Sequence, residues 1–510
     1  MSERFNSLKK IAHGAGLTFL FSAGAYGVTF FFKLLAARYF SQEAFGQFVL
    51  GETVLNIIVL VVGLGITEGV QRYIPVYRER GHEAKLTGYL RFVFLTPLLG
   101  ALLVGAALFF SAPWVTSFFG FPEGFTLFLK ILSFGVPLSA FQKITSQILI
   151  TERRVGLEAF IQPFFEELVK LVGMSLIMFY DLGVLSLIVL LLVSVAVTAL
   201  LNGVSYLVLV PLRPSGDSKY DLRDWLSFSL PLFLTSFLTM FISWTDNFVI
   251  GKFLEPSDLA VYSIAFSIAG TLKVFYKSLN SLFTPILSEY YGRDDLASVK
   301  FLFKRVTAWV FGLSVPAFLV MVFYSEEILR LLYGGSYAEG WLVLVIVAIG
   351  MLVNVSVGPA AAILNIVKET NNIFYADVAA ATLNVAGNLV LVPMIGLQGA
   401  ALASSASLIV NNVLYIWWAK QEINVGFDWV YYVKFVAAGL PAAFVSALLF
   451  RVFSNTILQV VTAGVTYAAL YLVLLFALNT FHEKDYEMLE AVAEYLGFDV
   501  AWLTSYVRWE

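Results

Sequence analysis

The segment AARYFSQEAFGQFVL, residues 36–50, is a short polar turn between two long apolar runs, and it decides how the chain folds. A related turn, IGKFLEPSDLAVYSI, occupies residues 250–264. Aligning Arg38 with Lys252 gives a shift of 252 − 38 = 214 positions, and the large apolar residues that follow the two turns then coincide. The repeat predicts that the chain is built from two related halves.

The composition places the chain in a membrane. Hydrophobic residues make up 59%, charged residues only 13%, and the mean hydropathy is +0.84, whereas a soluble domain is roughly 45–50% apolar. Apolar segments of about 20 residues, the length that crosses a bilayer, recur along the chain. We expect an all-α polytopic membrane protein with about fourteen spans, near residues 11–37, 45–73, 87–111, 125–150, 157–180, 183–210, 225–250, 259–287, 301–324, 340–365, 372–393, 398–419, 429–450 and 456–479.

Residue counts and motifs argue against several function classes. The chain has no cysteine, which excludes disulfides and thiol-based sites, and its three histidines are far apart in sequence. The net charge of −3 and the short basic clusters do not fit a nucleic-acid-binding protein. The glycine spacing in GLGITEG (residues 63–69) is wrong for a dinucleotide loop, and P-loop, GxSxG and HExxH motifs are absent. We therefore expect a protein that is not an enzyme and has neither a metal site nor a cofactor.

Basic residues indicate which loops face the cytoplasm. With the N-terminus inside, about twenty lysines and arginines fall in cytoplasmic tails and loops and about four outside, a strong positive-inside pattern. Both termini are then cytoplasmic, the first span is retained, and the repeats run parallel. The expected divisions are an N-lobe at 1–211, a C-lobe at 212–420, two further spans at 421–480 and an amphipathic cytoplasmic tail at 481–510.

Polar residues line one face of the first and the seventh span. Spacings of three and four residues place each set on a single helical face. Hydroxyls alone would favour hydrogen bonds between helices, whereas the charge at the end of each stripe favours a hydrated cavity. The candidate cavity residues are Ser22, Tyr26, Thr29 and Lys33 in the first span, Ser236, Thr239, Ser243 and Asp246 in the seventh, and Glu52 and Asn56 in the second.

The eighth span carries two lysines at membrane depth. Lys273 and Lys277 are four residues apart, and Asn280 continues the same face. Each lysine near the bilayer centre costs on the order of 2.5–3.5 kcal/mol, so the pair requires water, carboxylates or an anionic ligand. Two interpretations stay open: ion pairs with Glu52 or Asp246, or a site for an anionic ligand.

Other ionisable residues are interpreted as structural. In the fifth span the spacing between the glutamates at 166–167 and Lys170 permits ion pairs within one helix, and Lys143 could join them. Near the cytoplasmic side we expect Glu68 to pair with Arg72.

Three segments carry a resemblance to a known family: ARYFSQEAFGQF (37–48), EEILRLLYGGSYAEG (326–340) and LNVAGNLVLVPMIGLQGAALASSAS (383–407). The sequence resembles the polysaccharide-transport branch of the multidrug/oligosaccharidyl-lipid/polysaccharide (MOP) flippase superfamily, the Wzx-type flippases, over essentially its whole length. The resemblance implies a two-lobed transporter of fourteen helices with a V-shaped central cavity. Such a transporter moves a polyprenyl- or dolichyl-(pyro)phosphate-linked oligosaccharide from the inner to the outer leaflet by alternating access.

The resemblance also implies roles for individual residues. In relatives, cationic cavity residues hold the phosphate of the lipid-linked substrate. Independently of the resemblance, resetting an empty cationic cavity can use protons or sodium, and Asp246 is the candidate carboxylate for that coupling. The candidates for phosphate binding are Lys273, Lys277, Lys33 and Asn280.

Two other classes of protein remain open. A cation or drug antiporter of the same superfamily would have a cavity dominated by carboxylates, and a membrane-embedded glycan-modifying enzyme would turn over its substrate. For a flippase, the expected partners are the lipid-linked oligosaccharide, membrane lipids and glycosyltransferases of the same pathway, with no nucleic acid. We expect it to act as a monomer in the cell membrane.

Overall fold

The chain is all-helical over the residues that the computed structural model describes, which are 2–121, 124–210, 212, 216–450, 452 and 456–480. Side chains are described from residue 20 onward, apart from a few positions in α1, α9, α11 and α19. The expected tail at 481–510 therefore lies outside the described residues. The first elements are α1 (Ser2–Tyr39), α2 (Gln42–Gly63), α3 (Val70–Glu79), α4 (Glu83–Phe119), α5 (Phe125–Thr151), α6 (Val155–Ala159), the π-helical turn η1 (Phe160–Phe165), α7 (Glu166–Phe179), α8 (Leu185–Leu209) and α9 (Leu222–Phe253).

The remaining elements continue without a strand among the described residues. They are α10 (Pro256–Gly270), α11 (Lys273–Gly292), α12 (Leu296–Phe323), α13 (Ser325–Tyr333), the 3₁₀ turn η2 (Gly335–Gly340), α14 (Trp341–Ser356), α15 (Ala360–Ile366), α16 (Thr370–Ile395), α17 (Leu397–Ile423), α18 (Trp429–Phe450) and α19 (Thr456–Ala477).

Eleven helices in the described part of the chain are long and apolar enough to cross a membrane. The expected number of about fourteen spans is therefore not confirmed. Of the three other expected segments, 157–180 is divided by the π-helical turn η1, and 259–287 is interrupted after Gly270, where α10 ends and α11 begins at Lys273. Segment 225–250 lies inside the continuous helix α9.

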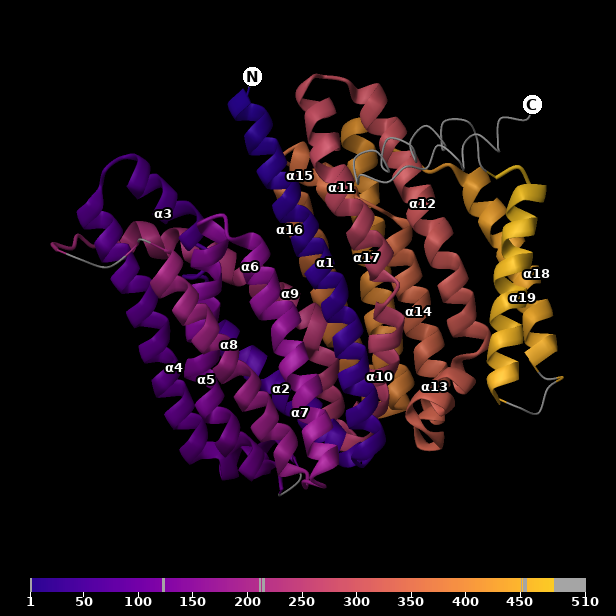
Figure 1. Cartoon of the computed structure of the whole chain (residues 1–510), viewed down its shortest axis with the longest axis horizontal. Helices are drawn as coiled ribbons and strands as arrows, with labels where there is room; N and C mark the ends of the chain where they lie inside the picture. Colours follow the sequence, from indigo (N-terminus) through magenta and orange to yellow (C-terminus); the bar gives the residue numbers. More distant parts are fainter. Residues whose placement is uncertain are drawn as a thin grey trace. The chain divides into compact units, whose positions relative to one another are not determined.

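The helices form two compact units. One unit comprises Met1–Thr271, Leu329–Ile346 and Asp377–Ser407, and the other comprises Leu272–Ile328, Val347–Ala376 and the chain from Leu408 onward. In the first unit α5 contacts both α4 and α8, and the three helices run side by side (Figure 1). The division into lobes at 1–211 and 212–420 stays a prediction.

Both copies of the repeated turn form a helix, a short break and a second helix. In the first copy, α1 ends at Tyr39 and Ser41 caps α2 by accepting a 3.2 Å hydrogen bond from the backbone N–H of Ala44. In the second, α9 ends at Phe253 and α10 begins with a capping box between Glu255 and Asp258. The polar residues at these turns satisfy backbone N–H groups that the first turn of a helix leaves without partners.

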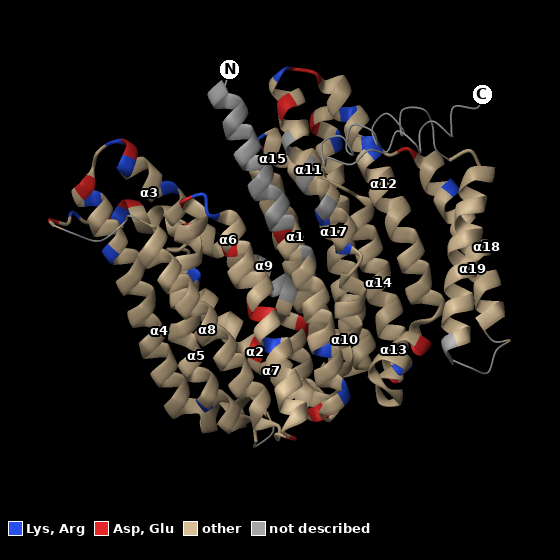
Figure 2. Ribbon diagram, viewed as in Figure 1, with Lys and Arg blue, Asp and Glu red and all other residues tan. Residues whose placement is uncertain are grey.

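Aromatic side chains join the neighbouring ends of α3, α4 and α9 in the first unit. Tyr73 and Tyr89 pack with their ring centroids 4.9 Å apart, and Tyr89 contacts Trp225 at 5.1 Å. The indole N–H of Trp225 donates a 2.9 Å hydrogen bond to the Tyr77 hydroxyl. Figure 2 shows many charged residues of this unit gathered around α3 and the neighbouring helix ends.

In the second unit, α12 packs against the last two helices. Phe311 stacks on Tyr432 of α18 with 4.3 Å between ring centroids, and the Tyr471 hydroxyl of α19 donates a 3.0 Å hydrogen bond to the Gly312 carbonyl. These contacts attach α18 and α19 to the rest of that unit.

Candidate functional site

Asp246, on α9, lies at the centre of a polar cluster formed by four helices of the first unit. Its carboxylate accepts hydrogen bonds from the Tyr262 hydroxyl of α10 at 2.5 Å and from the Ser404 hydroxyl of α17. The amide groups of Asn384 and Asn388, one turn apart on α16, donate to the same carboxylate at 3.1 and 2.7 Å. The five residues form what we call the Asp246 cluster.

The Asp246 cluster is buried, and its carboxyl group has no basic partner among the described residues. Asp246 is only 2% exposed, and no basic side chain within the described residues lies within 4 Å of its carboxylate. The side-chain oxygens of Asn384 and Asn388, both fully buried, have no hydrogen-bond partner among the described residues. The Asp246 carboxylate accepts from amide N–H and hydroxyl donors, and the two amide oxygens without a partner are hard ligands, which suit an alkali cation rather than a transition metal. Among the described residues, no group of three or more histidines and acids could hold a metal ion.

A second buried polar cluster centres on Lys170 of α7, which is 5% exposed. Its ammonium lies 2.8 Å from Glu167 and 3.5 Å from Glu166, both in the first turn of the same helix. Glu52 of α2 reaches it at 3.5 Å, and Gln142 of α5 donates a 2.8 Å hydrogen bond to Glu166. Figure 2 shows red and blue ribbon near the labels of α2 and α7. The five residues form what we call the Lys170 cluster.

The π-helical turn η1 leads directly into the Lys170 cluster. Phe160 and Phe164 of this turn pack on Phe21 of α1 with ring centroids 5.2 and 5.6 Å away. Pro163 lies inside the turn and cannot donate a backbone hydrogen bond. Glu166 and Glu167 follow directly after this turn, so its aromatic contacts with α1 fix the position of the two glutamates at the start of α7.

The candidate residues of the first span lie along α1. Ser22 and Lys33 are partly buried and Tyr26 is 40% exposed, whereas the Thr29 hydroxyl donates to the Ala25 carbonyl of its own helix at 2.8 Å. The charges that act on Lys33 include attraction from Glu52 and Glu167 and repulsion from Lys170. Lys33 therefore lies beside the Lys170 cluster.

The other candidates on α2 and α9 are less closely defined. Asn56 is exposed and Ser236 is partly buried. The side chains of Thr239 and Ser243 lie outside the described residues. Within the first unit, the structure thus brings Glu52 to Lys170 and places Asp246 in a separate cluster.

Lys273, Lys277 and Asn280 belong to the second unit, all on α11. Lys273 is partly buried and Lys277 is exposed, while the Asn280 side-chain oxygen accepts a 3.3 Å hydrogen bond from Thr284. Within the described part of the chain, no carboxylate lies within 4 Å of Lys273. Glu52 bonds to Lys170, and Asp246 bonds to neutral donors.

The ion pairs expected from the sequence are partly corrected. The pairing of Lys170 with Glu166 and Glu167 is confirmed. Lys143 does not join that cluster, because its ammonium lies 3.1 Å from Glu68. The expected pair between Glu68 and Arg72 is therefore wrong, and the Arg72 guanidinium stacks instead on the Phe228 ring at 4.3 Å.

The partners of Asp246 were missed by sequence reasoning, although their signal was visible. Asn384, Asn388 and Ser404 all lie in the segment 383–407, which carried the resemblance to a family. The two asparagines are four residues apart and so share a helical face. A polar pair on one face of an apolar span indicates a buried polar contact, but the pattern alone does not name the partner.

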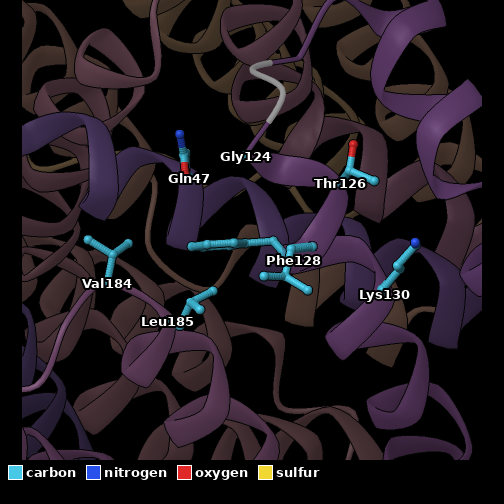
Figure 3. A pocket seen from close by; sticks show the side chains of 8 residues that line it. Gln47, Gly124, Thr126, Phe128, Lys130, Val184 and Leu185 are labelled. Carbon is cyan, nitrogen blue, oxygen red and sulfur yellow. The ribbon is translucent and has the colours of Figure 1, made fainter.

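A pocket of about 440 Å³ lies elsewhere in the first unit, between the beginnings of α2, α5 and α8. Figure 3 shows Gln47, Thr126 and Phe128 around it, together with the Lys130 side chain. None of the candidate site residues lines this pocket. It is distinct from both polar clusters.

The arrangement of the helices in this multi-pass membrane protein matches that of solved structures. The fold is that of MOP-superfamily membrane proteins. The structure is similar to the inward closed conformation of the lipid II flippase MurJ, with a TM-score of 0.70 at 16% identity over 90% of this chain and 99% of that one. It is also similar to an inward-facing multidrug resistance MATE family transporter, with a TM-score of 0.60 at 15% identity over 80% of this chain and 98% of that one.

Sequence comparison identifies the family within that class. The chain belongs to the family described as polysaccharide biosynthesis protein, which matches residues 34–342. It is similar to the probable low-salt glycan biosynthesis flippase Agl15 of Haloferax volcanii, at 24% identity over 419 residues and 82% of both chains. It is also similar to the succinoglycan biosynthesis transport protein ExoT of Rhizobium meliloti, at 25% identity over 67% of this chain and 66% of that one.

Proposed function

We propose that this protein is a flippase that moves a polyprenyl- or dolichyl-(pyro)phosphate-linked oligosaccharide from the inner to the outer leaflet by alternating access. The observation that carries the proposal is Lys273, a partly buried lysine without a described carboxylate within 4 Å. A lysine in a membrane protein requires an opposite charge or water, and a phosphate headgroup supplies the charge. The names of Agl15 and ExoT support a glycan substrate.

The physics of the bilayer explains why such a substrate needs a protein. Each unsatisfied hydroxyl of a glycan costs several kcal/mol in hydrocarbon, whereas a prenyl tail is soluble there. The glycan must therefore cross in a polar cavity while the tail stays in lipid. Moving a headgroup with about two negative charges outward across about 100 mV, negative inside, releases roughly 4–5 kcal/mol.

In this proposal the candidates for phosphate binding are Lys273, Lys277 and Asn280 of α11 and Lys33 of α1. The cavity that the glycan crosses is lined by Ser22, Tyr26, Thr29, Glu52, Asn56, Ser236, Thr239 and Ser243.

The Asp246 cluster is the candidate for ion coupling in the same proposal. A proton or sodium gradient can drive the return of the empty carrier, and Asp246 would bind the ion that couples the two. The buried charge of Asp246 and the unpartnered oxygens of Asn384 and Asn388 support this role.

We also propose a location, an oligomeric state and an orientation for the protein. It acts in the cell membrane as a monomer, with both termini in the cytoplasm, as the distribution of basic residues indicates. It changes no covalent bond in its substrate, and glycosyltransferases of the same pathway supply that substrate.

A reconstitution experiment tests the function directly. The purified protein is placed in liposomes that carry a synthetic polyprenyl-pyrophosphate oligosaccharide, and an impermeant lectin reports the outer-leaflet glycan. We expect the lectin-accessible fraction to change with time only when the protein is present, with the mass of the lipid unaltered. A changed mass would indicate an enzyme, and transport of a cationic dye without movement of the glycan would indicate an antiporter.

A further inference from the structure

The two copies of the repeated turn pack against each other in the first unit. Helix α2, which follows the first copy, contacts α10, which follows the second. Gly46 of α2 lies against the Pro256 backbone so closely that a Cβ at position 46 would stand 1.7 Å from the Pro256 carbonyl oxygen. Gly251, in the last turn of α9, meets Leu50, where a Cβ would stand 2.8 Å from its Cδ1 atom. Each copy therefore contributes a glycine to a seam between them.

The seam is tight and mainly apolar. Phe45, Leu50 and Leu259 are each at most 1% exposed. Among the described residues one hydrogen bond crosses it, from the Asn247 amide to the Thr53 hydroxyl at 3.1 Å. No ion pair joins α2 to α9 or α10 in the described part of the chain. Apolar surfaces with one neutral hydrogen bond can separate into a polar cavity without leaving a buried charge unpaired.

A second contact beside the seam joins the first copy of the turn to α13. The Arg38 guanidinium donates to the backbone carbonyls of Leu331 and Leu332, the latter at 2.5 Å from Nε. These carbonyls belong to the last turn of α13, where unpaired acceptors and the helix dipole favour a cation. Arg38 thus holds the end of α1 to the end of α13.

From this geometry we infer that Gly46 sets the closure of the seam between the two turns, which in the proposed function is the outer gate of the transporter. The inference rests on the proposed function and on the side that the basic residues assign to the outside. The halves of an alternating-access transporter must part on the outer side to release a glycan. At the seam, the backbone of Gly46 lies directly against the backbone of Pro256. A methyl group at position 46 would prevent this contact. The Pro256 carbonyl is part of the main chain, so no change of rotamer can relieve the overlap.

The absence of cysteine from the chain allows a direct test of the gate. Thr53 is 3% exposed in the seam, so Thr53→Cys provides a buried thiol of nearly the same size. An impermeant maleimide is added from outside to this variant, with and without Gly46→Ala. We expect Gly46→Ala to raise the labelling rate about tenfold, since the closed state loses population. Gly464→Ala is the matched control, because its Cβ would meet nothing within 4 Å. An unchanged rate in folded Gly46→Ala protein would overturn the gate.

A cross-link tests the same gate without the glycine substitution. The side chains of Thr53 and Asn247 are 3.1 Å apart, so the pair Thr53→Cys and Asn247→Cys is oxidised to bridge α2 and α9. We expect flipping of the polyprenyl-pyrophosphate oligosaccharide to stop and a reductant to restore it. Undiminished flipping with the bridge closed would overturn the inference. If the labelling responds to Gly46→Ala but no lipid-linked glycan is flipped, the gate stands and the proposed function fails.

Discussion

The Lys170 cluster and the Asp246 cluster are two buried charges with opposite surroundings in one compact unit. Three carboxylates lie within 3.5 Å of the Lys170 ammonium. Asp246 has four neutral donors and no cation within 4 Å among the described residues. The first charge is compensated by the protein itself, and the second is stabilised by dipoles alone.

The difference indicates different tasks. An ion pair inside a bilayer has little reason to open, because each partner would be left uncompensated. A carboxylate held by neutral donors can exchange a proton or cation without breaking any ion pair. Hydroxyls and amides have both donor and acceptor atoms, so by rotating they can hydrogen-bond to either the ionised or the protonated carboxyl group. In the proposed function, Lys170 therefore has a structural role and Asp246 has the role of binding the coupling ion.

Lys170→Met should produce the largest effect. It leaves the partly buried Glu52, Glu166 and Glu167 without their shared cation, and breaking a buried ion pair costs about 3–5 kcal/mol. We expect the variant to lose most of its folded yield, and the rest to unfold at a much lower temperature in detergent. Thermal unfolding followed by tryptophan fluorescence measures the change.

A double variant separates charge from packing in this prediction. Glu167 makes the shortest contact with Lys170, at 2.8 Å, so adding Glu167→Gln to Lys170→Met removes one of the stranded charges. We expect part of the lost stability to return. If Lys170→Met alone is as stable as the parent protein, the cluster has no structural role and the contrast with Asp246 disappears.

Asp246→Asn should leave the fold intact and affect transport. The substitution keeps the shape of the side chain but removes its ability to ionise. We expect ion-driven flipping to be lost, because an amide neither takes up a proton nor carries the charge that attracts a cation, with only a modest change in the unfolding temperature. Flipping is measured in liposomes with an imposed proton or sodium gradient.

Asp217→Asn serves as the matched control, because Asp217 is exposed in the loop before α9. Its rate should equal that of the parent protein under either gradient. Gradient-driven flipping by Asp246→Asn at the parent rate would remove the coupling role and make the Asp246 cluster purely structural.

Lys273→Ala extends the comparison to a lysine that has no described carboxylate within 4 Å. Unlike Lys170, it should contribute to ligand binding and little to stability. Losing one charge-assisted contact with phosphate costs about 1.5–2 kcal/mol, or roughly tenfold in affinity, and adding Lys277→Ala should weaken binding further. Binding of the polyprenyl-pyrophosphate oligosaccharide in detergent is the measurement, with Lys130→Ala, at the separate pocket, as the control. Loss of stability with unchanged affinity would place Lys273 in the same class as Lys170.

Much of the fold could be predicted from the sequence, since helical spans and their polar faces depend on local periodicity and length. The repeated turn was recognisable because its polar caps and large apolar residues recur at one shift. The number of spans was harder to predict. The π-helical turn at Phe160–Phe165 and the break between Gly270 and Lys273 interrupt apolar runs that look continuous by hydropathy.

The site could be predicted only in part, because the packing of the helices decides which residues that are far apart in sequence come into contact. Asp246 was identified from its place on a polar stripe, whereas Tyr262 and Ser404 reach it from other helices. Lys143 shows the same limit. Its spacing allowed contact with the glutamates of the fifth span, but the packing of α5 brings it to Glu68 beyond the end of α2.

Lys143→Met should produce the smallest effect and completes the comparison. The pair between Lys143 and Glu68 is 3.1 Å long, but both side chains are about a quarter exposed, at 28% and 25%. Such pairs contribute about 0–1 kcal/mol to the free energy of unfolding, far less than the ion pairs of Lys170.

Burial acts to raise the pKa of Glu68, but the Lys143 charge and the Thr67 hydroxyl outweigh it and hold that pKa below its usual value. The pair therefore stabilises the fold above the unfolded-state pKa of Glu68, and this stability is lost as the pH falls through the lower folded-state pKa. We expect the small difference in unfolding temperature between Lys143→Met and the parent protein to vanish in acid, and a difference that grows as the pH falls would contradict the assignment.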